Sequence, residues 1–231
     1  MTLPTVILPG YLAGAVDYQG LERSLQTLGI PATTVPLRWQ DWLPTIGGRS
    51  VAPILAQLDA TVQAMLRQYG SAKVNLIGHS AGGWLARIYL GEKPYSVGVK
   101  TGQAPRWHAR LQVATLVTLG TPHSSQERWT RANLDFVNLT YPGAFYPDVK
   151  YVCVAGKAIY GDRWRSWLAY SSYQLTCGNG NCWGDGITPI EAAHLTGANN
   201  LVVAGACHSP KARGAWYGSP EVLQEWVGWL G

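Results

Sequence analysis

The chain has 231 residues, of which 47% are hydrophobic and 13% are charged. This composition excludes a disordered chain, because the hydrophobic fraction is large enough to build a buried core. The 18 Lys and Arg residues outnumber the 13 Asp and Glu residues and give a net charge of +5. These cations are scattered along the chain, which argues against nucleic acid as a partner and leaves a mild preference for an anionic lipid surface.

No segment of the sequence predicts export or membrane insertion. The N-terminus lacks the basic and apolar regions of a signal peptide, and no apolar run approaches the roughly 18 residues of a spanning helix. We therefore expect a cytoplasmic protein. Cys177 and Cys182 flank a Gly-Asn-Gly-Asn turn that brings two thiols together, and both a local disulfide and a pair of free thiols fit this spacing. The pair offers too few ligands for a zinc site.

Continuous apolar runs alternate with amphipathic segments along the chain. Strands are predicted at residues 3–9, 33–37, 73–77, 112–119, 149–155 and 200–204, and helices at residues 17–28, 51–69, 83–90 and 219–230. Strands that are apolar on both faces and separated by helices predict a parallel sheet covered by helices on both sides. The expected fold class is therefore α/β, with a compact, six-stranded, mostly parallel sheet in a single domain spanning residues 1–231.

Long segments rich in Trp, Tyr and Pro interrupt this alternation, and segments of this length are usually functional. Residues 92–110 and 156–183 are the expected cap or lid elements. The second of these carries Trp164 and Trp167, which are predicted to wall an apolar substrate pocket. The alternative is ordinary surface packing by aromatic rings, which the composition does not distinguish from a pocket wall.

Residues 78–82, which read GHSAG, carry the most specific chemical signal in the chain. They follow the predicted strand at 73–77 and precede the predicted helix at 83–90. A G-x-S-x-G turn in this context is typical of a nucleophile elbow, which holds a serine out at the carboxyl edge of a sheet. The flanking glycines tolerate a positive φ or a close backbone approach. The pattern therefore predicts Ser80 as a nucleophile.

A serine hydroxyl needs a neighbouring base, and after such an elbow the expected chain order is serine, acid, histidine. His208 follows the last predicted strand, which is where the base belongs. Asp162 and Asp185 both fit the position of the acid. Asp185 is preferred because glycines on both sides allow a tight turn, whereas Asp162 lies beside two arginines as a solvated side chain would. The carboxylate of Asp185 would hold the imidazole of His208 in the required tautomer.

Backbone N–H groups are expected to stabilise the negative charge that develops on a substrate oxygen. The N–H of Ala81 follows the nucleophile, and the N–H of Tyr11 lies in the Pro-Gly loop after the first strand. The predicted pocket residues are Leu12, His79, His123, Trp164 and Trp167. Among them, His79 is expected to point away from Ser80 and to pack behind it.

Five pieces of sequence, in order, resemble serine lipases and esterases of the α/β-hydrolase superfamily, including the inositol-deacylase-like lipases. They are residues 8–11 (LPGY), 78–82 (GHSAG), 119–123 (LGTPH) and 184–186 (GDG), and the late His208. The resemblance implies hydrolysis of a lipid-like acyl ester through an acyl-enzyme, without a cofactor or metal, in a monomer that contacts a membrane surface at most peripherally. Many bacterial lipases have His-Gly where this chain has Pro9-Gly10, so the subfamily stays open.

Two other functions are compatible with the same residues. A thioesterase or acyltransferase would use the same serine, acid and histidine on a different acyl group. A ligand receptor with this fold would use the pocket without catalysis, although a complete set of Ser80, Asp185 and His208 argues against it. The fold by itself does not distinguish these substrates.

Overall fold

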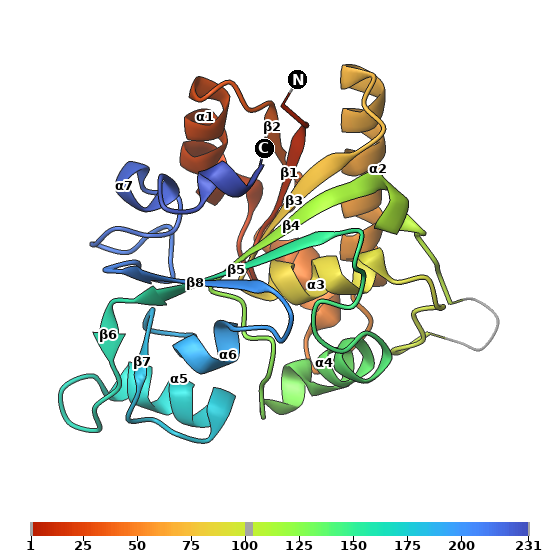
Figure 1. Ribbon diagram of the computed structural model, residues 1–231. Helices are drawn as coiled ribbons and strands as arrows, with labels where there is room; N and C mark the ends of the chain where they lie inside the picture. The colour runs from red at the N-terminus through yellow and green to blue at the C-terminus, as the bar shows by residue number, and fades with distance from the viewer. Residues whose placement is uncertain (1, 100–103, 231) are drawn as a thin grey trace.

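The computed structural model describes residues 2–99 and 104–230, and its centre is a six-stranded sheet (Figure 1). The strands lie in the order β2-β1-β3-β4-β5-β8, and every neighbouring pair is parallel. Their bounds are Thr5–Leu8 (β1), Ala32–Thr34 (β2), Val74–His79 (β3), Val113–Leu119 (β4), Lys150–Lys157 (β5) and Asn199–Ala204 (β8). All six predicted strands are present, so the expected α/β sheet is confirmed.

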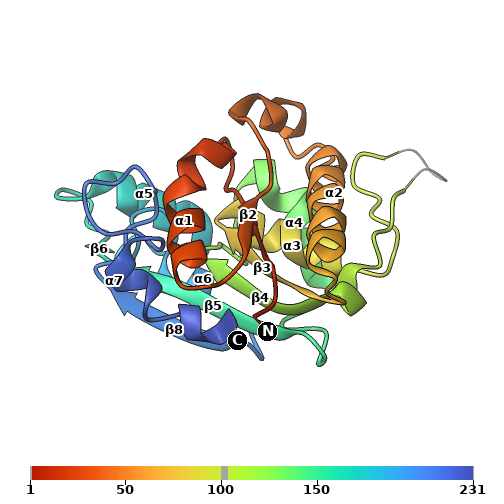
Figure 2. The same ribbon diagram turned by 90° about the horizontal axis from the view of Figure 1, so that it is seen from above.

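Helices cover both faces of this sheet (Figures 1 and 2). They are α1 (Gln19–Thr27), α2 (Ala52–Tyr69), α3 (Ala81–Leu90), α4 (Arg128–Thr140), α5 (Trp167–Cys177), α6 (Ile190–Ala193) and α7 (Pro220–Leu223), with shorter 3₁₀ turns at Ala15–Tyr18, Trp39–Thr45, Ala109–Gln112 and Val227–Leu230. Helices α2, α3 and α4 pack on one face, and α1, α7 and the last 3₁₀ turn pack on the other. None of these helices is long and apolar enough to cross a membrane, within the part of the chain described here.

The two cores follow from the alternation of side chains along each strand. In β1, Val6 and Leu8 face the α2–α3 side, whereas Ile7 faces the α1–α7 side. Both faces are buried, which explains why the strands read as continuous apolar runs. The predicted parallel sheet with two covered faces is therefore the observed one.

The C-terminal helix predicted at 219–230 is wrong as a continuous element. It is broken into α7 and a 3₁₀ turn around the fully buried Trp226, whose Nε1–H donates to the carbonyl of Tyr217 at 2.9 Å. Gly228 has low helix propensity, and the packing of Trp226 against the sheet determines the path of the chain instead.

The carboxyl edge of the sheet carries structure that the sequence did not predict. A two-stranded antiparallel ribbon, β6 (Ile159–Tyr160) and β7 (Trp183–Gly184), lies with α5 and α6 at the lower left of Figure 1. The segment 156–183 is thus mostly folded into regular elements. Part of the other expected cap element, 92–110, lies outside the described residues at positions 100–103.

Candidate active site

Ser80 lies in the sharp turn between β3 and α3. Its φ of 52° and ψ of −123° put a non-glycine residue in a strained backbone region. Gly78 and Gly82 serve this turn through close contact: a Cβ on Gly78 would meet the backbone of Gly82, and a Cβ on Gly82 would meet the backbone of Leu8. The positive φ belongs to Ser80 itself, and the glycines let the two flanking backbones approach.

Three of the predicted side chains meet at this turn. The Oγ of Ser80 lies 3.0 Å from Nε2 of His208, and Nδ1 of His208 lies 2.7 Å from Oδ2 of Asp185. Ser80 and His208 follow β3 and β8 of the six-stranded sheet, and Asp185 follows β7 of the two-stranded ribbon. In the tautomer that satisfies both contacts, Nδ1–H donates to the carboxylate and Nε2 accepts from the serine hydroxyl. This arrangement can remove the Ser80 proton.

Asp185 is completely buried and accepts four hydrogen bonds. The N–H groups of Ile187 and Thr188 donate to Oδ1 at 2.9 and 2.7 Å, while His208 and the Tyr217 hydroxyl each reach Oδ2 at 2.7 Å. Burial by itself would raise the pKa of Asp185, but His208 and these donors hold it below its ordinary value. The side chain therefore stays a carboxylate when the imidazole becomes charged.

Tyr217 is a residue that the sequence analysis missed. Its hydroxyl accepts from the N–H of Gly156 at 2.8 Å and donates to Asp185. Burial and the neighbouring carboxylate raise its pKa well above the ordinary value, so the phenol keeps the proton that it donates. Tyr217 is separated from Asp185 by 32 positions, and no local pattern links the two residues.

Asp162, the alternative acid, is directed elsewhere. Its carboxylate accepts hydrogen bonds from the N–H groups of Trp164 and Arg165, at 2.9 and 2.8 Å, and so stabilises a turn before α5. These backbone donors lower the pKa of Asp162. Its contacts are those of a solvated turn residue, and none of them involves His208.

The loop after β1 packs directly against Ser80. A Cβ on Gly10 would lie 2.9 Å from Cβ of Ser80, which leaves this loop beside the nucleophilic oxygen. Tyr11 and Ala81 both border the cavity in front of Ser80. Ala81 is the first residue of α3, so its N–H has no acceptor within the helix. Both residues thus border the space next to the Ser80 hydroxyl.

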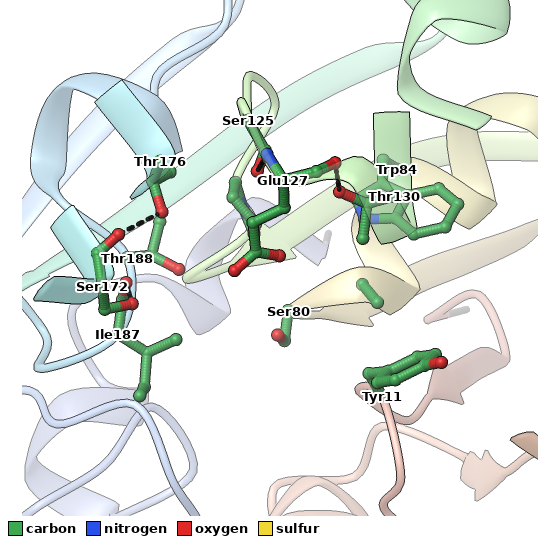
Figure 3. A pocket seen from close by; sticks show the side chains of 12 residues that line it. Tyr11, Ser80, Trp84, Ser125, Glu127, Thr130, Ser172, Thr176, Ile187 and Thr188 are labelled. Carbon is green, nitrogen blue, oxygen red and sulfur yellow. Dashed lines mark hydrogen bonds between the residues drawn. The ribbon is translucent and has the colours of Figure 1, made fainter. Parts of the chain in front are cut away.

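A cavity of about 420 Å³ opens in front of Ser80 (Figure 3). It is lined by Tyr11, Ser80, Ala81, Trp84, Pro122, Ser125, Glu127, Thr130, Ser172, Thr176, Ile187 and Thr188. None of the five predicted pocket residues borders this cavity. The segment 156–183 does contribute to the wall, but through Ser172 and Thr176 of α5 rather than through its tryptophans, and Glu127 lies at the start of α4, a helix that the sequence did not predict.

Leu12 and His79 lie around the site rather than in this cavity. Leu12 is exposed on the far side of the Tyr11 loop and borders a separate hollow with Trp39. His79 is buried behind Ser80 and borders a small space with Gly10 and His208. Its expected packing role matches this location.

His79 joins three parts of the site through hydrogen bonds. The N–H of Gly10 donates to the Tyr18 hydroxyl at 2.9 Å, and this hydroxyl lies 2.7 Å from Nδ1 of His79. On the other side of the ring, Nε2 lies 2.9 Å from the carbonyl oxygen of His208, which can only accept. The Nε2–H tautomer therefore satisfies the whole chain. Burial and the proximity of His208 lower the pKa of His79 to about 3.

His123 is part of a buried polar cluster between α3 and α4. Its Nδ1 lies 3.5 Å from Nη1 of Arg87, its Nε2 lies 3.2 Å from the Thr118 hydroxyl, and its carbonyl accepts from Asn138 at 2.8 Å. Burial and the Arg87 charge lower the pKa of His123 well below its ordinary value. These contacts stabilise the loop that places Pro122 at the cavity wall, and the ring itself stays in the core.

Trp164 and Trp167 point to solvent rather than into a pocket. Their exposed fractions are 89% and 61%, and Leu168 on the same helix is exposed as well. Helix α5 buries Ala169 and Tyr173 instead, and it turns Ser172 and Thr176 toward the cavity. The inward positions of α5 are already filled, so the Trp167 ring remains outside, and Trp164 lies in the turn before the helix.

Among the described residues, no group of three or more His, Cys, Asp or Glu side chains is arranged to hold a metal ion. The four cysteines are free thiols. Cys177 and Cys182, the pair for which a disulfide was considered, both direct Sγ toward the carbonyl of Asn179, at 3.4 and 3.3 Å.

Comparison with known proteins gives one family match, which covers part of the chain. Residues 43–140, from the segment before α2 to the end of α4, match the PGAP1-like alpha/beta domain. This stretch contains Ser80 but ends before Asp185 and His208. No curated protein sequence matches the chain.

Solved structures match over almost the whole chain. The lipase BlEst2 of Bacillus licheniformis is 19% identical and superposes with a TM-score of 0.68, over 99% of this chain and 92% of that protein. The product of the lin2722 gene of Listeria innocua is 13% identical, with a TM-score of 0.53 over 100% and 94% of the two chains. At these identities, the similarity establishes a shared fold.

Proposed function

We propose that this chain is a serine hydrolase of the α/β-hydrolase superfamily that cleaves carboxylic esters, because its fold matches that of a lipase and part of its sequence matches a PGAP1-like alpha/beta domain. The observation that carries the proposal is the continuous hydrogen-bonded path from Ser80 Oγ through His208 to the buried Asp185. A cavity open to the Ser80 hydroxyl leaves room for an acyl ester beside it. The similar protein from Bacillus licheniformis is a lipase, which supports an ester as the substrate class.

The proposed reaction proceeds in two halves. His208 Nε2 takes the proton of Ser80 as Oγ attacks the carbonyl carbon of the ester. The former carbonyl oxygen becomes negatively charged and accepts hydrogen bonds from the N–H groups of Tyr11 and Ala81. The charged imidazole then gives its proton to the departing alcohol, which leaves an acyl-enzyme on Ser80. Water attacks this ester with His208 again as the base, and the carboxylic acid and free Ser80 result. Asp185 remains ionised and stabilises the imidazolium in both halves.

Labelling and turnover together test this function. A fluorophosphonate should react once per chain at Ser80, and p-nitrophenyl esters should be hydrolysed. Ser80→Ala should lose labelling and lower kcat by roughly 10⁴–10⁶, since only the oxyanion donors and binding remain. An acyl-CoA measured in parallel distinguishes a thioesterase. Labelling that survives in Ser80→Ala would contradict the assignment of the nucleophile.

We further propose that the exposed aromatic residues before and on α5 contact a lipid surface that presents the substrate. Trp164, Trp167 and Leu168 form this surface, and Arg163 and Arg165 flank Trp164. Tryptophan and arginine together suit the boundary of an anionic membrane. The same helix turns Ser172 and Thr176 toward the cavity, so this contact would hold the cavity close to the lipid.

A further inference from the structure

The cavity beside Ser80 carries several hydrogen-bond acceptors on a wall that is otherwise mainly apolar. Three of its hydroxyl groups donate their protons to backbone carbonyls: Ser172 to Ile187 at 2.6 Å, Thr176 to Ser172 at 2.7 Å, and Thr188 to Gly120 at 2.8 Å. A hydroxyl whose proton is engaged in this way offers only lone pairs to a ligand. The wall therefore favours a ligand group that brings its own donors.

Glu127 adds a negative charge to this wall. It lies at the start of α4, half-buried, and its carboxylate points into the space above the Ser80 hydroxyl (Figure 3). Its backbone is fixed, because its N–H donates to Ser125 Oγ at 3.1 Å and its carbonyl accepts from Arg131 at 3.1 Å. The carboxylate is thus presented from a defined position.

No cation among the described lining residues balances this charge. The described residues of the cavity wall include no Lys, Arg or His, and the ion pairs of the described side chains connect other acids to Arg110, Arg131, His208 and Lys211. A carboxylate that is partly removed from water is costly unless a donor or a cation meets it. Tyr11 and Trp84 border the same space, and their ring faces also attract a cation.

We propose that this cavity is a subsite for a protonated primary amine on the ester substrate. An ammonium group supplies three donors to the acceptors on this wall and a positive charge to Glu127, which a neutral alkyl chain does not. An acyl group that ends in a carboxylate would be repelled by the same residue. The inference rests on the proposed ester hydrolysis and names the substrate class that the site would select.

Matched p-nitrophenyl esters test this selectivity. The 6-aminohexanoate, 6-hydroxyhexanoate and heptanoate esters have chains of equal length that end in an ammonium, a hydroxyl and a methyl group. At low ionic strength, kcat/KM for the ammonium ester should exceed that for heptanoate by roughly tenfold, as for one charge-assisted contact. Glu127→Gln should bring the ratio of the two kcat/KM values, ammonium ester over heptanoate, to about one. Glu225→Gln, the same change on an exposed residue, should alter neither.

The possible results distinguish failure of the subsite from failure of the proposed ester hydrolysis. An ammonium advantage that is absent, that persists in Glu127→Gln, or that the hydroxyl ester equals would overturn the subsite. If wild type hydrolyses none of the esters, the proposed function fails, and calorimetric binding of hexylammonium and 1-hexanol then decides the subsite separately. Tighter binding of hexylammonium that weakens in Glu127→Gln supports it, and equal binding of both ligands in both proteins refutes it.

Discussion

The turn at Ser80 and the aromatic segment at residues 156–183 differ in how far their sequences determine the direction of a side chain. At Ser80, the flanking backbones approach so closely that only glycine fits at positions 78 and 82, and the serine has one direction left. In the aromatic segment, composition indicates large rings but not the side of α5 on which they lie. Trp164 and Trp167 face solvent, while small hydroxyl residues face the cavity.

The difference shows that a steric constraint predicts geometry better than a preference does. A close backbone contact admits one residue type in one conformation. A tryptophan gains from burial in a pocket, a core or a lipid surface alike, so its presence does not identify its surroundings. Variants of the two regions can test whether catalysis depends on the turn at Ser80 and its partners, and whether the aromatic segment binds a lipid surface.

The largest difference between the two regions should appear in their acids. Asp185→Asn should lower kcat by about 10³–10⁴, because an amide no longer holds the required imidazole tautomer or stabilises its charge. Asp162→Asn should leave kcat within about twofold, since its carboxylate serves only a local turn. Steady-state kinetics on purified variants with matched circular dichroism spectra measures both. The reverse ranking would move the acid into the aromatic segment.

Acidification should switch the enzyme off through a single proton. Protonated His208 cannot accept from Ser80, so kcat/KM should fall about tenfold per pH unit on the acid side. The pKa of Asp185 is held low and that of His79 is lowered to about 3, so neither adds a second step near neutrality. The slope of log kcat/KM against pH measures this.

His123→Gln provides the control for the same experiment, because burial already keeps this ring neutral. The variant should retain the acid limb and most of the activity, whereas His208→Gln should be inactive. If the acid side of the pH profile shifts in His123→Gln, or if log kcat/KM falls with a slope of two, a group other than His208 contributes to the loss of activity.

Sequence patterns predicted the sheet and the three residues that converge, for reasons that are local. Each strand is an apolar run, the elbow is a five-residue turn, and the chain order places His208 after the last strand. Asp185 was distinguished from Asp162 by its own flanking glycines and by the two arginines beside Asp162. These features depend on few neighbours, so a single sequence contains them.

The remaining features depend on contacts between distant segments. Tyr217 reaches Asp185 across 32 positions, and Tyr18 reaches His79 across 61. Part of the cavity wall comes from α4 and α5, neither of which was predicted as a helix, so Glu127 could not be placed beside Ser80. The last helix breaks because Trp226 is buried by the sheet, which overrides its amphipathic pattern.

A smaller effect on kcat should come from Tyr217, which acts on the site only through its hydrogen bond to Asp185. Tyr217→Phe removes one of four donors from Asp185 and leaves the Gly156 N–H without its acceptor. We expect the pKa of Asp185 to rise, the free energy of unfolding to fall by about 1–3 kcal/mol, and kcat to fall by roughly tenfold. Chemical denaturation and steady-state kinetics measure these changes.

Tyr89→Phe is the matched control, because its hydroxyl also donates to a carboxylate, that of Asp59 at 2.8 Å, but on α2 and α3 away from Ser80. This variant should lose stability and keep kcat. Equal losses of kcat in both variants would show that Tyr217 contributes to folding only and does not position the acid.

The smallest effect on turnover, and the most specific one for the aromatic region, concerns lipid binding. Trp164→Ala with Trp167→Ala should weaken binding to vesicles of phosphatidylglycerol and phosphatidylcholine and leave the hydrolysis of a soluble ester unchanged, because neither ring borders the cavity. Trp39→Ala removes another ring, 53% exposed, from a different surface and should not affect binding. Arg163→Gln with Arg165→Gln should reduce binding only where the lipid is anionic, by about 1 kcal/mol for each arginine near the surface. Cosedimentation with vesicles of phosphatidylcholine alone and with vesicles that also contain phosphatidylglycerol separates the contribution of the tryptophans from that of the arginines. If the Trp164 and Trp167 variant binds like wild type, the aromatic residues have no part in lipid contact, and their exposure needs another explanation.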